Sequence, residues 1–208
     1  MTTYPATEPD AIDRAVEVLR RGGLVAYPTD TVYGLAADPT NDAAVERLFA
    51  AKRRRPGQPP PILIAATDDA ERFAAEVPSV ARELMRAFWP GALTIVLRKA
   101  EAFHSRAVPG DTIGLRVPGH AVPRELARRL GGPITGTSAN LAGGPEPLEA
   151  KDVVAQLGGA IDLVIDGGRC PGGTPSTVVD CTAEPPRIVR AGAIGREELG
   201  RAAGVTFD

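Results

Sequence analysis

The chain has 208 residues, a formal net charge of -2 at pH 7 and 43% hydrophobic residues. This length suits one large domain with a sizeable core, and the near-neutral charge excludes a polycation that binds nucleic acid by charge alone. No basic and apolar leader opens the sequence, and no window approaches ~18 apolar residues. We therefore expect a soluble, cytoplasmic protein with no membrane partner.

The histidines and cysteines do not indicate a metal site. His104 and His120 lie in neither an HExxH nor an HxH pattern, and Cys170 and Cys181 form no CxxC pair. We therefore predict no zinc site. The two cysteines could form one disulfide or stay reduced, and the sequence leaves both open.

The predicted elements begin with a helix, a strand and a second helix. Gly22-Gly23 ends the first helix, and the apolar run Leu24–Tyr27 follows as a strand. The second helix starts at Asn41, a suitable N-cap, and ends in the cationic run 52–55 before Pro56. Helical spacing is carried by Ile12, Ala15, Val16 and Leu19 and then by Ala44, Val45, Leu48 and Phe49.

Strand-like and helical patterns alternate along the rest of the chain. The strand-like runs are Ile62–Ala66, Leu93–Arg98, Thr112–Val117, Ile134–Thr137, Leu163–Ile165, Thr177–Asp180 and Arg187–Arg190. The helical patterns are Ala70–Ala75, Ser79–Phe88, Pro123–Leu130, Glu149–Leu157 and Arg196–Ala202. This alternation predicts an α/β fold with a β-sheet flanked by helices, and the sheet is expected to be mixed because the last two strands follow each other without a helix. No repeat or low-complexity linker divides the chain, so we predict one domain.

The stretch YPTDTVYGL, residues 27–35, carries polar side chains at the end of a predicted strand. Pro28 removes a ladder donor, so the strand ends there and Thr29, Asp30 and Thr31 follow. Polar groups at a strand end of an α/β protein indicate a ligand crevice. A capped turn, in which Asp30 or Thr31 binds the next backbone amides, explains the same pattern, and the pattern alone leaves both interpretations open.

Two cationic segments are candidates for anion binding. In the run AKRRRPGQPPP, residues 51–61, the prolines fix the path of the chain, so an arginine held there can bind phosphate oxygens with two nitrogens. Arg116 alternates with apolar residues of a predicted strand, so it points away from the core and is expected to pair with a carboxylate or phosphate. The alternatives are a solvated charge run and a solvent-facing arginine.

Two further loops carry hydroxyl and amide groups. GTSAN, residues 136–140, is not a GxSxG elbow, but its hydroxyl, amide and backbone donors suit an anion-binding loop. The glycine-rich stretch 167–175 leads to Ser176 at a strand start, and Arg190 ends the next strand. Neither a GxxxxGK[ST] loop nor a GxGxxG turn is present. ATP, if bound, must be bound by another scheme.

Seven segments, taken in order, resemble the YrdC-type family of threonylcarbamoyl-AMP synthases. They are YPTDTVYGL, the AKxR run, WPGALTIVL, DTIGLR, TSAN, PSTVVD and VRAGAI. Each motif is weak alone, but seven in register are highly specific. The resemblance implies a single YrdC-like catalytic domain over residues 10–197, with terminal extensions at 1–9 and 198–208. It also implies a broad, concave, cationic cleft beside the twisted mixed sheet.

The same resemblance implies an ATP-dependent reaction. L-Threonine, bicarbonate and ATP would give L-threonylcarbamoyladenylate and pyrophosphate, the first step of threonylcarbamoyl-adenosine modification of tRNA beside the anticodon. Mg²⁺ would accompany ATP, with no metal held by the protein itself. A tRNA threonylcarbamoyl transferase complex would act downstream, and weak RNA binding would fit the cleft.

Residue roles follow by position from the resemblance. The threonine-binding residues would be Thr31, Leu63, Arg116, Gly136 and Ser176. The ATP-binding residues would be Lys52, Arg54, Gln58, Thr112, Ser138, Asn140, Glu146 and Arg190. Catalysis would rest on Lys52, Arg54 and Arg190, which would offset charge on the departing pyrophosphate. Helix phase favours Lys52 and Arg54, whereas alignment on the Arg-Pro pair favours Arg53 and Arg55, and we take the first.

Two other functions fit parts of the pattern. A carbamoyl-adenylate domain of the hydrogenase-maturation type shares these motifs, but it normally belongs to a much longer protein with zinc-finger and acylphosphatase parts. An RNA-binding module could use the cleft and the run 52–55 without chemistry. The hydroxyl groups of Thr31 and Ser176 favour a small-molecule substrate instead.

Overall fold

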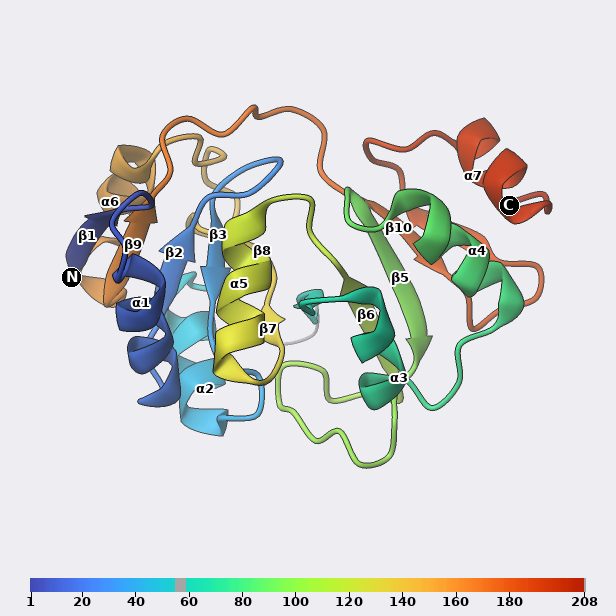
Figure 1. The fold of residues 1–208 in the computed structure, drawn as a ribbon, viewed down its shortest axis with the longest axis horizontal. Helices are drawn as coiled ribbons and strands as arrows, with labels where there is room; N and C mark the ends of the chain where they lie inside the picture. Colours follow the sequence, from blue (N-terminus) through green and yellow to red (C-terminus); the bar gives the residue numbers. More distant parts are fainter. Residues whose placement is uncertain (55–58, 208) are drawn as a thin grey trace.

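The computed structural model describes residues 1–54 and 59–207, which form an α/β fold with two mixed sheets (Figure 1). The first sheet has the strand order β1-β9-β2-β3-β8, formed by Thr2–Pro5, Leu163–Asp166, Val25–Tyr27, Gly34–Ala36 and Thr137–Ser138. The second has the order β11-β10-β5-β6-β4-β7, formed by Arg187–Arg190, Thr177–Asp180, Leu93–Arg98, Thr112–Arg116, Ile62–Leu63 and Ile134–Thr135. The predicted fold class and the mixed pairing are confirmed, but the strands divide between two sheets rather than one.

Helices cover both faces of the first sheet. The helices are α1 Ala11–Arg20, α2 Asp42–Ala51, α3 Ala70–Phe73, α4 Ser79–Phe88, α5 Ala121–Leu130, α6 Ala150–Leu157 and α7 Arg196–Ala203, with 3₁₀ turns at Thr67–Asp69 and Gly158–Ala160. The apolar residues of α1 and α5 pack on one face of this sheet, and those of α2 and α6 pack on the other. Helix α2 starts as predicted, because the Asn41 side chain accepts a hydrogen bond from the Ala44 amide.

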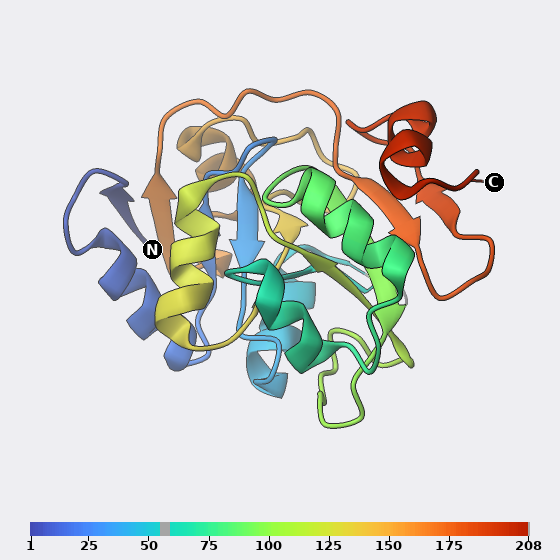
Figure 2. The same ribbon diagram turned by 45° about the vertical axis from the view of Figure 1, so that its right-hand side comes forward.

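The second sheet has one core face and one open face. Helices α3, α4 and α7 pack against the core face, where Ile95, Ile113 and Val179 are buried (Figure 2). Because successive side chains of a strand alternate, Val96, Gly114 and Val178 point to the other face. That face is the one available for a ligand.

The predicted strand Ile134–Thr137 breaks at Gly136, and this break joins the two sheets. β7 before the break pairs with β4 in the second sheet, and β8 after it pairs with β3 in the first. The Gly136 amide donates to the Pro61 carbonyl at 2.8 Å. A Cβ atom here would lie only 2.7 Å from Leu63 Cδ2, so the close approach of the chains requires glycine.

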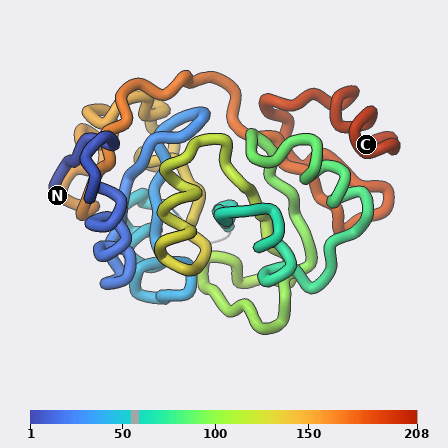
Figure 3. Tube along the Cα trace, in the orientation of Figure 1, coloured from blue at the N-terminus to red at the C-terminus, as the bar shows by residue number. Residues whose placement is uncertain are grey.

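Two short strands were not predicted, and both lie in the first sheet. β1 is an edge strand that pairs with β9 and is mostly exposed, so it lacks an apolar signal. β3 begins at Gly34, directly after the polar turn, and has only three residues. β1 lies in the predicted terminal extension 1–9, and α7 begins within the predicted domain and runs into the extension 198–208. The tube in Figure 3 shows the chain ends on opposite sides of the molecule.

Two features concern the environment of the protein. Among residues 1–54 and 59–207, no helix combines the length and the apolar character that crossing a lipid bilayer requires. Cys170 and Cys181 are both buried and both free thiols. Of the two interpretations of the cysteines, the structure therefore shows the reduced one.

Candidate active site

A cleft of about 740 Å³ is lined by strands and loops of both sheets. Nine of the residues predicted for the site line this cleft: Thr31, Arg54, Leu63, Arg116, Gly136, Ser138, Glu146, Ser176 and Arg190. They come from segments far apart in the sequence, and the β7–β8 junction brings the two groups of segments together. The structure thus collects most of the predicted residues around one cavity.

The YPTDTVYGL stretch forms a capped turn that also faces the cleft. Thr29 Oγ1 accepts a hydrogen bond from the Thr31 amide at 2.9 Å and donates to the Val32 carbonyl at 2.6 Å. Thr29 therefore closes the turn, not Asp30 or Thr31 as the capped-turn interpretation predicted. Thr29 and Thr31 both line the cleft, so the turn and the crevice interpretations hold together.

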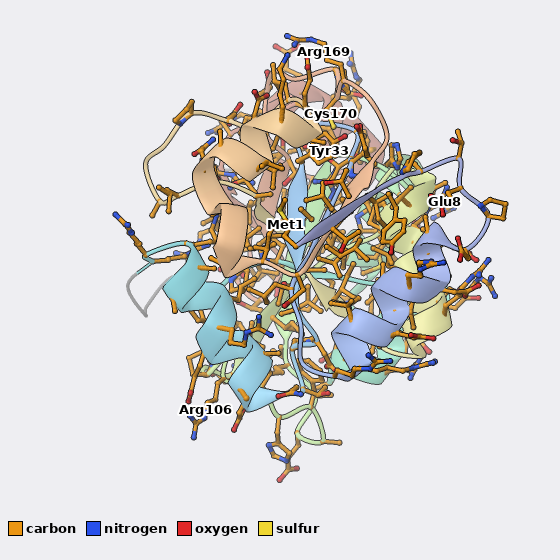
Figure 4. All side chains as sticks on the ribbon, turned by 90° about the vertical axis from the view of Figure 1, so that its left-hand side faces the viewer. Met1, Glu8, Tyr33, Arg106, Arg169 and Cys170 are labelled. Carbon is orange, nitrogen blue, oxygen red and sulfur yellow. The ribbon has the colours of Figure 1, made fainter. Side chains whose placement is uncertain are left out.

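The connection between β9 and β10, residues 167–176, is bound to the same turn. Its Gly172 amide donates to the Thr31 carbonyl at 2.8 Å, and the thiol of Cys170 accepts from the Thr29 amide at 3.4 Å. Tyr33 Oη donates to the Gly168 carbonyl at 2.8 Å, and Figure 4 shows the Tyr33 and Cys170 side chains close together beneath this connection. These bonds set the path by which the chain reaches Ser176.

Arg116 is held by an ion pair at one end of the cleft. Its Nη2 donates to both carboxylate oxygens of Asp30 at 2.7 Å, and its Nε donates to the Gly91 carbonyl at 2.8 Å. The side chain points away from the core, as the alternation predicts, and it is only 8% exposed. Nη1 donates no hydrogen bond to residues 1–54 or 59–207, because the bonds of this side chain come from Nε and Nη2. The carboxylate partner is therefore Asp30, while one nitrogen stays available to a ligand.

Arg190 lines the cleft near Arg116, and its hydrogen bonds within the described part of the chain go to neutral groups. Its Nε and Nη2 donate to the Ser176 carbonyl at 3.2 and 2.8 Å, and Nη2 also donates to Ser176 Oγ at 3.0 Å. Burial, together with the positive charge of Arg116, lowers the pKa of Arg190. Two neighbouring guanidinium groups, of which only Arg116 has a carboxylate partner among the described residues, Asp30, form a site that suits an anion.

Lys52 does not line the cleft but lies beneath the loop 138–142. Its Nζ donates to the Asn140 carbonyl at 2.8 Å and to the Ser138 carbonyl, and it is 3% exposed. The Lys52 carbonyl in turn accepts from the Ala142 amide at 2.9 Å. Burial, and then the charge of Arg54, lowers the pKa of Lys52 to about 8. Lys52 therefore holds the loop that carries Ser138.

Of the other residues predicted to bind ATP, some line the cleft and some do not. Arg54 lines the cleft and donates to Thr137 Oγ1 at 3.2 Å, whereas Arg53 is exposed and does not line it. Asn140 is buried behind the wall, where Nδ2 donates to the Gly144 carbonyl at 2.9 Å. Thr112 shares a face of β6 with Gly114 and Arg116 but starts the strand, away from the lining residues. Gln58, like Arg55, lies outside the described residues.

The cleft also has an apolar wall that the motifs did not reveal. Val96, Val178 and Val189 line it on neighbouring strands, and Tyr27 lines it with its hydroxyl bound to the Thr135 carbonyl at 3.1 Å. Alternation along β5 and β10 was the available signal, because it sets Val96 and Val178 opposite the core residues. In the described ranges, no group of three His, Cys, Asp or Glu side chains is arranged to hold a metal ion.

Comparison with known proteins supports the resemblance predicted from the motifs. A family model described as telomere recombination, Sua5_yciO_yrdC, matches residues 17–192. The threonylcarbamoyl-AMP synthase of Pyrococcus abyssi (strain GE5 / Orsay) is 41% identical over 192 residues, which cover 91% of this chain and 56% of that protein. A protein of Mycobacterium tuberculosis (strain CDC 1551 / Oshkosh), named as a putative threonylcarbamoyl-AMP synthase, is 37% identical over 210 residues. The matched segment covers 98% of this chain and 95% of that protein.

A solved structure agrees with the fold. The crystal structure of P. abyssi Sua5 complexed with L-threonine matches with a TM-score of 0.89 at 39% identity, covering 95% of this chain and 58% of that chain. The present chain therefore spans a little over half the length of these P. abyssi relatives. The family model and the relatives cover nearly all of the chain, and the chain thus belongs to the Sua5/YciO/YrdC family.

Proposed function

We propose that the chain makes L-threonylcarbamoyladenylate from L-threonine, bicarbonate and ATP and releases pyrophosphate. The observation that carries this proposal is the convergence of Arg54, Arg116, Ser176 and Arg190 on one cleft. The reaction would be the first step of threonylcarbamoyl-adenosine formation in tRNA. The named activity of the P. abyssi relative and the L-threonine in the Sua5 complex support the same assignment.

The amino acid would bind at the Arg116 end of the cleft. Nη1 of Arg116 can donate to the threonine carboxylate, because Asp30 and Gly91 occupy Nη2 and Nε. Thr31 and Ser176 supply hydroxyl groups beside it, and Leu63 and Gly136 form the floor where β4 meets the β7–β8 junction. Partial burial of the site strengthens these polar contacts relative to water.

ATP would lie along the wall that carries Arg54, Ser138 and Glu146, with its phosphates near Arg190. Asn140 and Lys52 would act on this wall from behind, through the loop 138–142. Thr112 and Gln58 remain predicted nucleotide contacts. Mg²⁺ would neutralise phosphate charge as the partner of ATP, and Glu146 is the acidic side chain that the cleft offers nearby.

The proposed chemistry needs positioning and charge neutralisation rather than a strong base. Once the threonine amine has captured carbon dioxide from bicarbonate, the resulting carbamate is already an anion. One carbamate oxygen would attack the α-phosphorus of ATP, and the bond from that phosphorus to the β-phosphate bridge oxygen would break. Arg54 and Arg190 would offset the charge on the departing pyrophosphate, which is electrostatic catalysis. This explains a cleft with cations and hydroxyls whose described lining includes no histidine.

The product would pass to a tRNA threonylcarbamoyl transferase complex, because an acyl-adenylate is a reactive intermediate. Weak RNA binding by the chain and a cytoplasmic location belong to the same proposal. The test is pyrophosphate release from ATP and bicarbonate, measured with each amino acid in turn. Release that depends on threonine is expected. Release without an amino acid, or faster release with serine than with threonine, would contradict the proposal.

A further inference from the structure

Thr94 lies next to Ser176 on the face of the second sheet that lines the cleft. Thr94 belongs to β5 and Ser176 immediately precedes β10, and the hydroxyl oxygens are 3.1 Å apart. Thr94 is 1% exposed. Within residues 1–54 and 59–207, Ser176 Oγ is the only hydrogen-bond partner of the Thr94 hydroxyl. The sequence motifs assign Thr94 no role.

Arg190 determines how the two hydroxyls must be oriented. A guanidinium group has only donors, so Ser176 Oγ accepts the 3.0 Å hydrogen bond from Arg190 Nη2. The buried Thr94 hydroxyl also has a proton that needs an acceptor, and Ser176 Oγ is the acceptor within reach. With both bonds in place, the two lone pairs of Ser176 Oγ are occupied. The proton of Ser176 is then left to point elsewhere.

The reverse orientation is less favourable. If Ser176 donated to Thr94, the proton of Thr94 would remain buried without an acceptor, which is the costly arrangement for a polar group. We therefore infer that Thr94 is a positioning residue that turns the Ser176 hydroxyl into a donor toward the amino-acid substrate. This inference rests on the proposed function. The substrate group that matches such a donor is the carboxylate, because Arg190, which contacts Ser176, and Arg116 line the same cleft.

Three variants test this role through the binding of L-threonine. Thr94→Val keeps the shape of the side chain but removes its donor, Thr94→Ser keeps the donor, and Ser176→Ala removes the group on which Thr94 acts. Titration calorimetry with L-threonine gives the dissociation constant of each. Thr94→Val is expected to weaken binding about fivefold, which corresponds to about 1 kcal/mol, whereas Thr94→Ser stays within twofold of the unaltered protein. The KM for threonine should rise with little change in kcat.

The double variant separates positioning from packing. If Thr94 acts only through Ser176, Thr94→Val combined with Ser176→Ala binds L-threonine no more weakly than Ser176→Ala alone. Thr177→Val is the matched control, because Thr177 is a fully buried threonine of β10 that faces the core and donates to the Ile194 carbonyl at 2.8 Å. It should lower the melting temperature and leave the dissociation constant unchanged.

Two results would overturn the inference, and a third would overturn its premise. Binding by Thr94→Val equal to that of the unaltered protein contradicts the role of Thr94. Additive losses in the double variant contradict action through Ser176. Failure of the unaltered protein itself to bind L-threonine removes the proposed function and the inference together, and this outcome is recognised before any variant is compared.

Discussion

Two buried cations beside the cleft are held in opposite ways. Arg116 is paired with the carboxylate of Asp30, whereas Lys52 is surrounded by the neutral oxygens of the loop 138–142. The ion pair with Asp30 offsets the charge of Arg116 and fixes its direction, so the nitrogen Nη1 is presented to a ligand. Lys52 has no such compensation from these neighbours, and burial lowers its pKa to about 8. One cation is therefore organised to meet a substrate and the other to shape a loop.

The largest effect is expected at the Arg116 end. Arg116→Gln should lower the free energy of unfolding by about 3 to 5 kcal/mol, because it leaves the partly buried Asp30 carboxylate without its partner. Denaturant unfolding measures this loss, and threonine-dependent pyrophosphate release should fall at the same time. Adding Asp30→Asn should recover part of the stability but not the activity. If Asp30→Asn recovers both, Arg116 has no direct role in binding.

The next largest effect is expected at Arg54, on the cleft wall that we propose binds ATP. Arg54→Ala should cost about 2 to 4 kcal/mol of transition-state stabilisation, measured as a fall in kcat/KM of about thirty- to a thousandfold. Arg53→Ala is the matched control, because Arg53 is the adjacent arginine and is exposed away from the lining residues. Equal losses at the two positions would show that the run acts only through its overall charge.

A smaller effect is expected at Gly136, in the β7–β8 junction that joins the two sheets. Gly136→Ala should destabilise the protein by about 1 to 3 kcal/mol, because its Cβ would approach Leu63 Cδ2 to 2.7 Å. Combining it with Leu63→Ala should recover part of the loss in thermal unfolding, since the obstructing side chain is then removed. A Gly136→Ala variant with unchanged stability would mean that β4 and the junction can move apart.

The smallest effect is the pH dependence at Lys52. Its pKa in the folded protein, about 8, lies below 10.5, the ordinary value for a lysine. Between these values the unfolded chain binds more protons, so the contribution of Lys52 to stability rises with pH, by at most about 1 kcal/mol per pH unit. The difference in unfolding free energy between the unaltered protein and Lys52→Met should therefore grow from pH 8 to pH 10. Lys151→Met, at an exposed lysine, should show no such growth.

Periodicity and motif order predicted the elements more successfully than the contacts. Thr177–Asp180 and Arg187–Arg190 form strands as predicted, because alternation and flanking turn residues are local properties. The break at Gly136 was not predicted, since it depends on a backbone partner 75 residues away, at Pro61. The pairing of Asp30 with Arg116 and the burial of Lys52 depend on long-range packing in the same way.

The route of the chain between the sheets has a consequence for folding. The chain passes from the first sheet to the second between β3 and β4, returns at Gly136, and leaves again through residues 167–176 (Figure 3). No single cut can separate the sheets into two fragments. Each sheet needs strands from both halves of the chain, so most of its pairings are non-local and form late. The cleft is thus a property of the completely folded chain, and a partly folded intermediate would have neither wall complete.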